Sequence, residues 1–110
     1  MLSFEQKKLI FESFTGLEER HISYGRVNYI YSKSLKRGKV LATQLNESGN
    51  GYIIGKYLEN ELIKKKGYLV DNQGWISIKN FSKQELIELI HLALNYMSST
   101  EQTSNPKKMI

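Results

Sequence analysis

The chain contains no cysteine, and its single proline, Pro106, stands near the end of its 110 residues. Without cysteine the chain can form no disulfide, bind no metal through thiolates and perform no thiol catalysis. These properties suit a reducing compartment, and we expect the protein in the cytoplasm. Because the only proline comes so late, no element before it loses a backbone N–H to a proline ring.

Long apolar runs are also missing. No stretch approaches the roughly 20 consecutive apolar residues that a membrane-spanning helix requires. The first eleven residues, MLSFEQKKLIF, lack the uninterrupted apolar core of a signal peptide. We therefore expect no membrane partner.

Motifs for catalysis, cofactors and metals are scarce as well. The only histidines, His21 and His91, lie far apart with no ligand spacing around either, so we predict no metal site. The glycines of residues 49–55 form G-x-G-x-x-x-G but precede a strand-like run, whereas a dinucleotide loop must open a helix. No serine stands in G-x-S-x-G. The sequence thus predicts a protein without catalytic residues or cofactor, not an enzyme.

Residues 39–58 carry the strongest local pattern in the chain. Two runs rich in β-forming residues, 39–45 and 52–58, flank the sequence NESGNG, which predicts a central hairpin. A further strand is expected at residues 21–31, with a bulge at Gly25. A second hairpin is expected from residues 67–70 and 75–79, and the polar segment 59–66 fits either a helical turn or an exposed loop.

A first helix is predicted over residues 2–14. Ser3 and Gln6 have the spacing of a capping box, in which each side chain accepts a hydrogen bond from the other residue's backbone N–H. Lys7 falls inside the apolar stripe of this helix. We expect its long side chain to carry the ammonium group out to solvent.

A second helix is predicted over residues 82–97, with a capping box formed by Ser82 and Glu85. Its apolar residues span an arc of about 220° on a helical wheel, wider than a helix lying on a sheet needs. We therefore expect this helix to be covered on two sides, by the sheet and by either the first helix or a second subunit.

Together these elements predict an α+β domain over residues 1–97. Its N-terminal helix is followed by a central antiparallel sheet of three to five strands and a C-terminal helix, with both helices packed on one sheet face. Residues 98–110 have the composition of a flexible polar tail.

Positive charge gathers in the predicted sheet. Residues 20–79 hold eleven Lys and Arg against four Asp and Glu, a net charge of +7 within a chain of +5. If both helices cover one face, the other exposes aromatic rings among basic groups, and Lys36, Arg37, Lys39 and residues 64–66 would widen the positive field. The candidate binding residues are Arg26, Tyr29, Tyr31, Tyr52, Lys56, Tyr57, Trp75 and Lys79.

Two functions fit these features. The first, which we rank slightly higher, is a small non-enzymatic protein-interaction module that self-associates or docks on a larger protein, because large apolar surface beyond a monomer's needs marks interfaces. The alternative is binding of single-stranded nucleic acid by the basic, tyrosine-containing sheet face, where cations meet phosphates and rings stack on bases.

Overall fold

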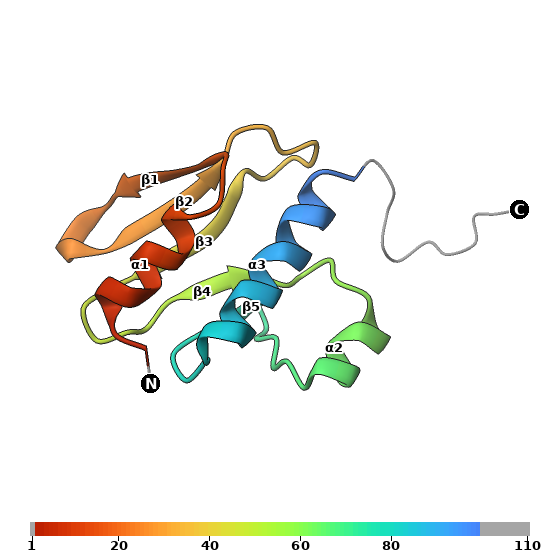
Figure 1. Cartoon of the computed structure of the whole chain (residues 1–110). Coiled ribbons are helices and arrows are strands. Elements are labelled where there is room, and N and C mark those ends of the chain that lie inside the picture. The colour runs from red at the N-terminus through yellow and green to blue at the C-terminus, as the bar shows by residue number, and fades with distance from the viewer. Residues whose placement is uncertain (1, 100–110) are drawn as a thin grey trace, which may run out of the picture.

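Five antiparallel strands follow one another across a single sheet in the order β1-β2-β3-β4-β5 (Figure 1). The structure is a computed structural model, which describes residues 2–99. The predicted tail spans residues 98–110, and its part after Ser99 lies outside the described residues. Within residues 2–99 the elements are α1 (Phe4–Glu12), β1 (Leu17–His21), a short 3-10 turn η1 (Ser23–Gly25), β2 (Val27–Tyr31), β3 (Val40–Leu45), β4 (Tyr52–Ile54), α2 (Asn60–Lys66), β5 (Trp75–Ser77) and α3 (Lys83–Met97).

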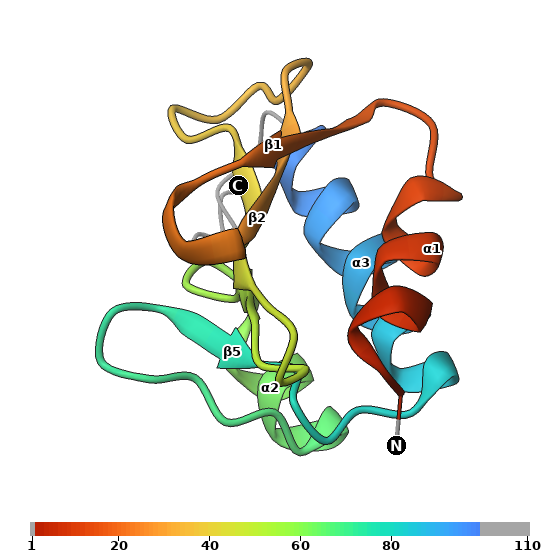
Figure 2. The same cartoon turned by 90° about the vertical axis from the view of Figure 1, so that its left-hand side faces the viewer.

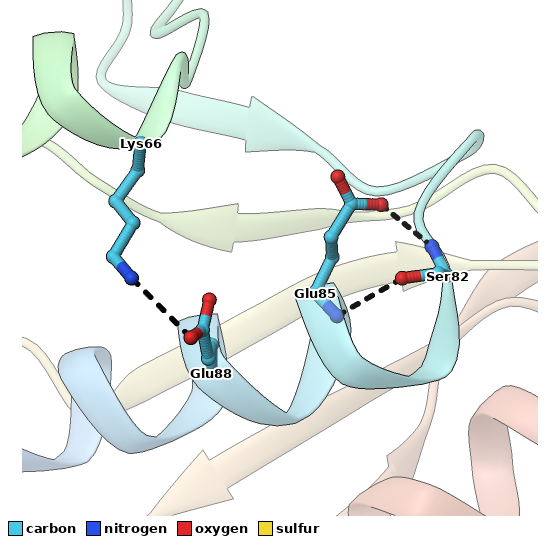
Figure 3. Close-up of polar contacts among 4 residues, drawn as sticks. All are labelled: Lys66, Ser82, Glu85 and Glu88. Atoms are coloured by element: carbon cyan, nitrogen blue, oxygen red, sulfur yellow. Dashed lines mark hydrogen bonds and ion pairs between the residues drawn. The ribbon is translucent and has the colours of Figure 1, made fainter.

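Helices α1 and α3 lie side by side on one face of the sheet, and the opposite face carries no helix in the described chain (Figure 2). The predicted α+β class, with terminal helices on one face of an antiparallel sheet, is confirmed. An ion pair connects the short helix α2 to α3. The Lys66 ammonium at its end is 3.3 Å from the Glu88 carboxylate of α3 (Figure 3).

The core fills the space between these two helices and the sheet. Phe11 of α1 stacks on Tyr29 of β2 with ring centroids 4.5 Å apart, and both are fully buried. Helix α3 buries an entire stripe of apolar side chains against α1, β3 and β4. Its broad apolar arc is therefore covered on two sides, as predicted, and α1 supplies the second side. The buried residues of α3 are Leu86, Leu89, Ile90, Ala93 and Met97.

Both helices begin as their sequences predict. The Gln6 N–H donates to Ser3 Oγ at 3.1 Å, and the Ser3 N–H donates to Gln6 Oε1 at 2.8 Å. Ser82 and Glu85 repeat this reciprocal pair with the same two distances (Figure 3). Each box satisfies two backbone donors that the first helical turn leaves without partners.

The single strand predicted at residues 21–31 is wrong. The chain forms two strands there, β1 and β2, joined by η1. β1 has the sequence LEERH, which is poor in β-forming residues. It lies at the sheet edge, where charged side chains suit an unpaired backbone. Gly25 occupies the turn with φ +70° rather than a bulge.

The bulges lie in β3 instead. Its pairing with β2 shifts register twice, and the neighbours Leu41 and Ala42 are both buried, although adjacent strand residues normally face opposite ways. Gln44 takes φ +61°. Asn28 of β2 accepts hydrogen bonds from the Gln44 N–H at 3.1 Å and the Thr43 hydroxyl at 2.8 Å, which satisfies the donors at this distortion.

The second half of the sheet is shorter than predicted. β4 ends at Ile54, and the chain then turns, with the Leu58 N–H donating to the Gly55 carbonyl at 3.2 Å. Of the two alternatives for residues 59–66, the helix is observed, and Gly67 caps its end with φ +75°. The strand predicted at 67–70 contributes only a bridge from Val70 to Ile76 of β5.

The expectation for Lys7 is also wrong. Its side chain is completely buried, and its ammonium donates to the backbone carbonyls of Gly49 at 2.7 Å and Lys79 at 3.0 Å. Lys7 thus ties α1 to the β3–β4 loop and to the segment after β5. Burial, and secondarily the charge of Lys79, lower the pKa of Lys7 below its ordinary 10.5.

Gly55 offers a direct test of packing between β4 and β5. A Cβ at Gly55 would overlap Cδ1 of Ile76 and lie 2.7 Å from its Cγ1, whereas one at Gly38 would meet nothing within 4 Å. We expect Gly55→Ala to lower the free energy of unfolding by about 1–3 kcal/mol in urea denaturation. Gly38→Ala should leave it unchanged or raise it by up to about 1 kcal/mol. Equal effects of the two substitutions would contradict this packing.

Lys7 should give a distinctive pH dependence. Because its pKa is lowered in the folded protein, the unfolded chain holds this proton at pH values where the folded chain has lost it. The contribution of Lys7 to stability therefore rises with pH between the lowered pKa and 10.5. Compared with Lys7→Met by urea unfolding, the wild type should gain relative stability as the pH rises toward 10.5. A difference in free energy of unfolding that stays constant with pH, or that changes in favour of the variant, would contradict this prediction.

Candidate functional site

A cavity of about 370 Å³ opens where β3 begins and β4 ends, beside the C-terminal end of α3. We call it the basic cavity. Its walls come from four parts of the chain: the loop before β3, the end of β4 with the turn after it, the turn before β5, and the last turn of α3. The described lining residues are Lys36, Arg37, Gly38, Lys39, Val40, Ile54, Lys56, Tyr57, Gln73, Trp75, Tyr96 and Met97.

The cavity lies beyond the point where β3 and β4 are paired. These strands share only two residue pairs, Ala42–Ile53 and Thr43–Tyr52. Val40 and Ile54, toward the cavity, have no partner in that ladder and form part of its apolar lining. Trp75 stands opposite Ile54 in the β4–β5 pair, so its indole belongs to the same wall.

The loop before β3 is organised by Ser34, which is buried. Its hydroxyl donates to the Gly38 carbonyl at 2.9 Å and accepts from the Lys36 N–H at 3.1 Å. The Lys39 ammonium donates to the Ser34 carbonyl at 2.7 Å. The Leu35 N–H donates to the Met97 carbonyl at 2.7 Å, which fastens the loop to the end of α3. The basic residues are thereby held on an ordered frame.

The opposite wall depends on the turn at residues 71–74. Asp71 Oδ1 accepts hydrogen bonds from the backbone N–H groups of Gln73 at 2.9 Å and Trp75 at 3.0 Å. Gly74 takes φ +92°, and a Cβ there would lie 2.6 Å from Cβ of Lys56. Glycine is needed at this position both for its backbone conformation and for the close passage of the Lys56 side chain.

Two stacked aromatic rings in the cavity lie between two cations. Tyr57 and Tyr96 stack with centroids 5.0 Å apart and ring planes 14° from parallel. The Lys36 ammonium lies 4.7 Å from the centroid of Tyr96, and the Lys56 ammonium lies 5.3 Å from that of Tyr57. Such contacts hold cations over ring faces. They place two positive charges beside one aromatic pair.

The electrostatics favour an anion. Lys36, Arg37, Lys39 and Lys56 line the cavity, and none of the described lining residues is Asp or Glu. Burial, and secondarily Tyr57, raise the pKa of Tyr96 to about 12. A tyrosine with its ordinary pKa of 10.0 is already neutral near pH 7, so the Tyr96 hydroxyl adds no negative charge to the site.

The structure brings three of the eight predicted binding residues together in this cavity: Lys56, Tyr57 and Trp75. Tyr29 is corrected, because it is 1% exposed in the core and cannot belong to an exposed face. Tyr31 is half-buried and shares a hydrogen bond of 3.0 Å with Ser98 at the end of α3.

The remaining three predicted residues also lie outside the basic cavity. Arg26 borders the β1–β2 turn, with its guanidinium 5.6 Å from the Tyr24 ring centroid. Tyr52 is half-buried on the helix-free face, opposite Thr43 and Ser77. Lys79 is exposed, and its carbonyl accepts the hydrogen bond from Lys7.

Tyr96 is the residue that sequence reasoning missed as a site residue. It belongs to the apolar arc of α3 and counted there as packing surface. One signal could have revealed it: Tyr96 is the only Phe, Tyr or Trp in α3, and it stands in the last turn, past most of the buried stripe. Lys36, Arg37 and Lys39 were expected only to widen the positive field, but they line the cavity itself.

Metal and membrane features are absent from the part of the chain that the structure describes. Among residues 2–99 no group of three or more His, Cys, Asp or Glu side chains is placed to hold a metal ion. No helix within the same residues is long and apolar enough to cross a membrane. The chain matches no protein-family model, no curated protein and no solved structure.

The raised pKa of Tyr96 can be observed directly. In an absorbance titration of tyrosinate, the wild type minus Tyr96→Phe difference should show one group titrating at about 12. Because the unfolded chain ionises this tyrosine from its ordinary pKa of 10.0, the contribution of Tyr96 to stability falls as pH rises above 10. Tyr96→Phe should therefore lose stability less steeply in that range. A difference curve centred on the ordinary tyrosine pKa of 10.0 would show that Tyr96 is not shielded from solvent.

Proposed function

We propose that this protein is a non-enzymatic binding protein for single-stranded nucleic acid and that the basic cavity is its contact site. One observation carries the proposal: four cations and three aromatic rings converge on one cavity whose described lining includes no carboxylate. Single-strand binders combine these two elements, since cations follow the phosphates and rings stack on bases. We keep a cytoplasmic location as part of the proposal, supported by the lack of cysteine.

The parts of the cavity have separate tasks in this proposal. Its volume of about 370 Å³ is at the lower end of the range of about 300–1,000 Å³ typical of small-molecule sites, which suits one nucleotide rather than a long segment. Trp75 offers a ring against the apolar wall of Val40 and Ile54, where a base can stack. Arg37 and Lys56 are exposed and can neutralise the flanking phosphates.

The protein-interaction module, which we ranked first from the sequence, stays a prediction. Its main support was the wide apolar arc of the last helix, and that arc is largely occupied within the monomer by α1 and the sheet. The large exposed apolar side chains are Leu9, Tyr24, Leu35, Tyr57 and Leu69, which come from different parts of the chain. The geometry therefore favours the nucleic-acid proposal.

Trp75 provides an internal probe because it is the only tryptophan in the chain and lines the cavity. Titration with short single-stranded oligonucleotides at low salt should quench its fluorescence as a base stacks on the indole. Unchanged emission with every oligonucleotide tested would contradict the proposed function.

A pair of matched variants tests the role of charge. Arg37→Gln with Lys56→Gln removes two cations from the cavity, and Lys65→Gln with Lys83→Gln removes two exposed cations elsewhere. Lys83 begins α3, about 20 Å along the helix axis from Tyr96. The cavity variant should flatten the plot of log affinity against log salt by about 1.4, or about 0.7 for each phosphate that is no longer neutralised. If both variants flatten it equally, net charge and not the cavity governs binding.

A further inference from the structure

A second cavity, of about 360 Å³, lies at the other end of β3. We call it the turn cavity. It is lined by Tyr24, Gly25 and Arg26 of the β1–β2 turn and by Asn46 and Glu47 from the loop after β3. Arg26, predicted from the sequence as a binding residue, belongs here and has no part in the basic cavity.

Tyr24 is the unusual residue of this turn. Its side chain is 92% exposed, so the ring contributes almost nothing to the core. Its backbone has φ +62°, a conformation that glycine or asparagine adopts at lower cost than tyrosine. Strained residues of this kind cluster at functional sites. The Arg26 guanidinium, 5.6 Å from the ring centroid, is held by a hydrogen bond of 2.9 Å from its Nε to the Ser23 carbonyl.

The turn thus presents an aromatic ring together with a guanidinium plane. Both groups stack on nucleobases, and arginine adds a positive charge. The Glu47 carboxylate at the same cavity opposes the close approach of a phosphate. This combination suits contact with a base more than contact with the backbone.

The two cavities lie at opposite ends of β3. Val40 lines the basic cavity and Asn46 lines the turn cavity, six residues later, which corresponds to about 20 Å of strand. The turn after β1 projects to the side away from α1 and α3 (Figure 2). Between the cavities, Thr43, Tyr52 and Ser77 form a cross-strand row. Their strand neighbours Ala42, Ile53 and Ile76 are buried toward the helices.

We propose that Tyr24 and Arg26 form a second contact for the strand that occupies the basic cavity, so that one nucleic-acid chain crosses the open sheet face along β3. This inference rests on the proposed function. It adds a path for the nucleic-acid strand across the protein and a minimum length that the strand needs to reach both cavities. A strand too short to cover about 20 Å engages one cavity alone. A longer strand engages both, and its second contact forms in an intramolecular step.

Affinity measured against oligonucleotide length tests the path. We would titrate labelled oligothymidylates of about two to about sixteen nucleotides, a range that covers known single-strand site sizes. The wild type should show a step in affinity of about tenfold or more once the strand spans both cavities. Tyr24→Gly should remove most of that step and leave the affinity of the shortest oligonucleotides unchanged.

Tyr24→Gly is suited to this test because glycine takes φ +62° freely, so the substitution should preserve or raise stability. Leu9→Ala removes another exposed side chain, on α1, and should leave the step intact. A smooth wild-type curve with no step, a step that survives Tyr24→Gly, or an equal loss at all lengths would overturn the second contact. Short oligonucleotides that still quench Trp75 would then leave the proposed function standing, whereas no response at any length overturns both.

Discussion

The burial of the apolar arc of α3 is the interaction on which the rest of the structure depends. Leu86, Leu89, Ile90, Ala93 and Met97 are almost completely withdrawn from water against the sheet and α1. Each fully buried side chain of the larger apolar types contributes about 1.5–3 kcal/mol. This packing also fixes the end of α3, and the loop before β3 is attached to that end through the Met97 carbonyl. The basic cavity exists where it does because the core fixes both of its sides.

The architecture was largely readable from the sequence, since strong local patterns coincide with the observed elements. The capping boxes at Ser3 and Ser82 start α1 and α3 as expected. β1 was missed because an edge strand shares hydrogen bonds on one side only and is often charged, so LEERH lacks the composition of a strand. Lys7 was misjudged because its two carbonyl partners, on Gly49 and Lys79, belong to segments that meet only in the folded chain.

The candidate site was less predictable for a similar reason. Lys56, Tyr57 and Trp75 were named as binding residues from composition, but composition could not separate them from Tyr29, which has the same β-forming character and is buried. The grouping with Tyr96 requires α3 to end beside the turn after β4. No local pattern specifies that distance, because it follows from the angle at which a helix crosses a sheet.

The strand order has a consequence for how the chain closes on itself. Each strand pairs with its neighbour in the sequence, and the connections from β1 to β4 are short loops whose closure entropy is small. Only the connection from β4 to β5 is longer, because it contains α2. The contact between α1 and α3 instead joins the first and last elements of the described chain. It is the pairing with the greatest separation along the sequence, and such contacts slow folding relative to local ones. The contact between these two helices therefore closes the fold, because it connects the two ends of a described chain whose strands pair mainly with their sequence neighbours.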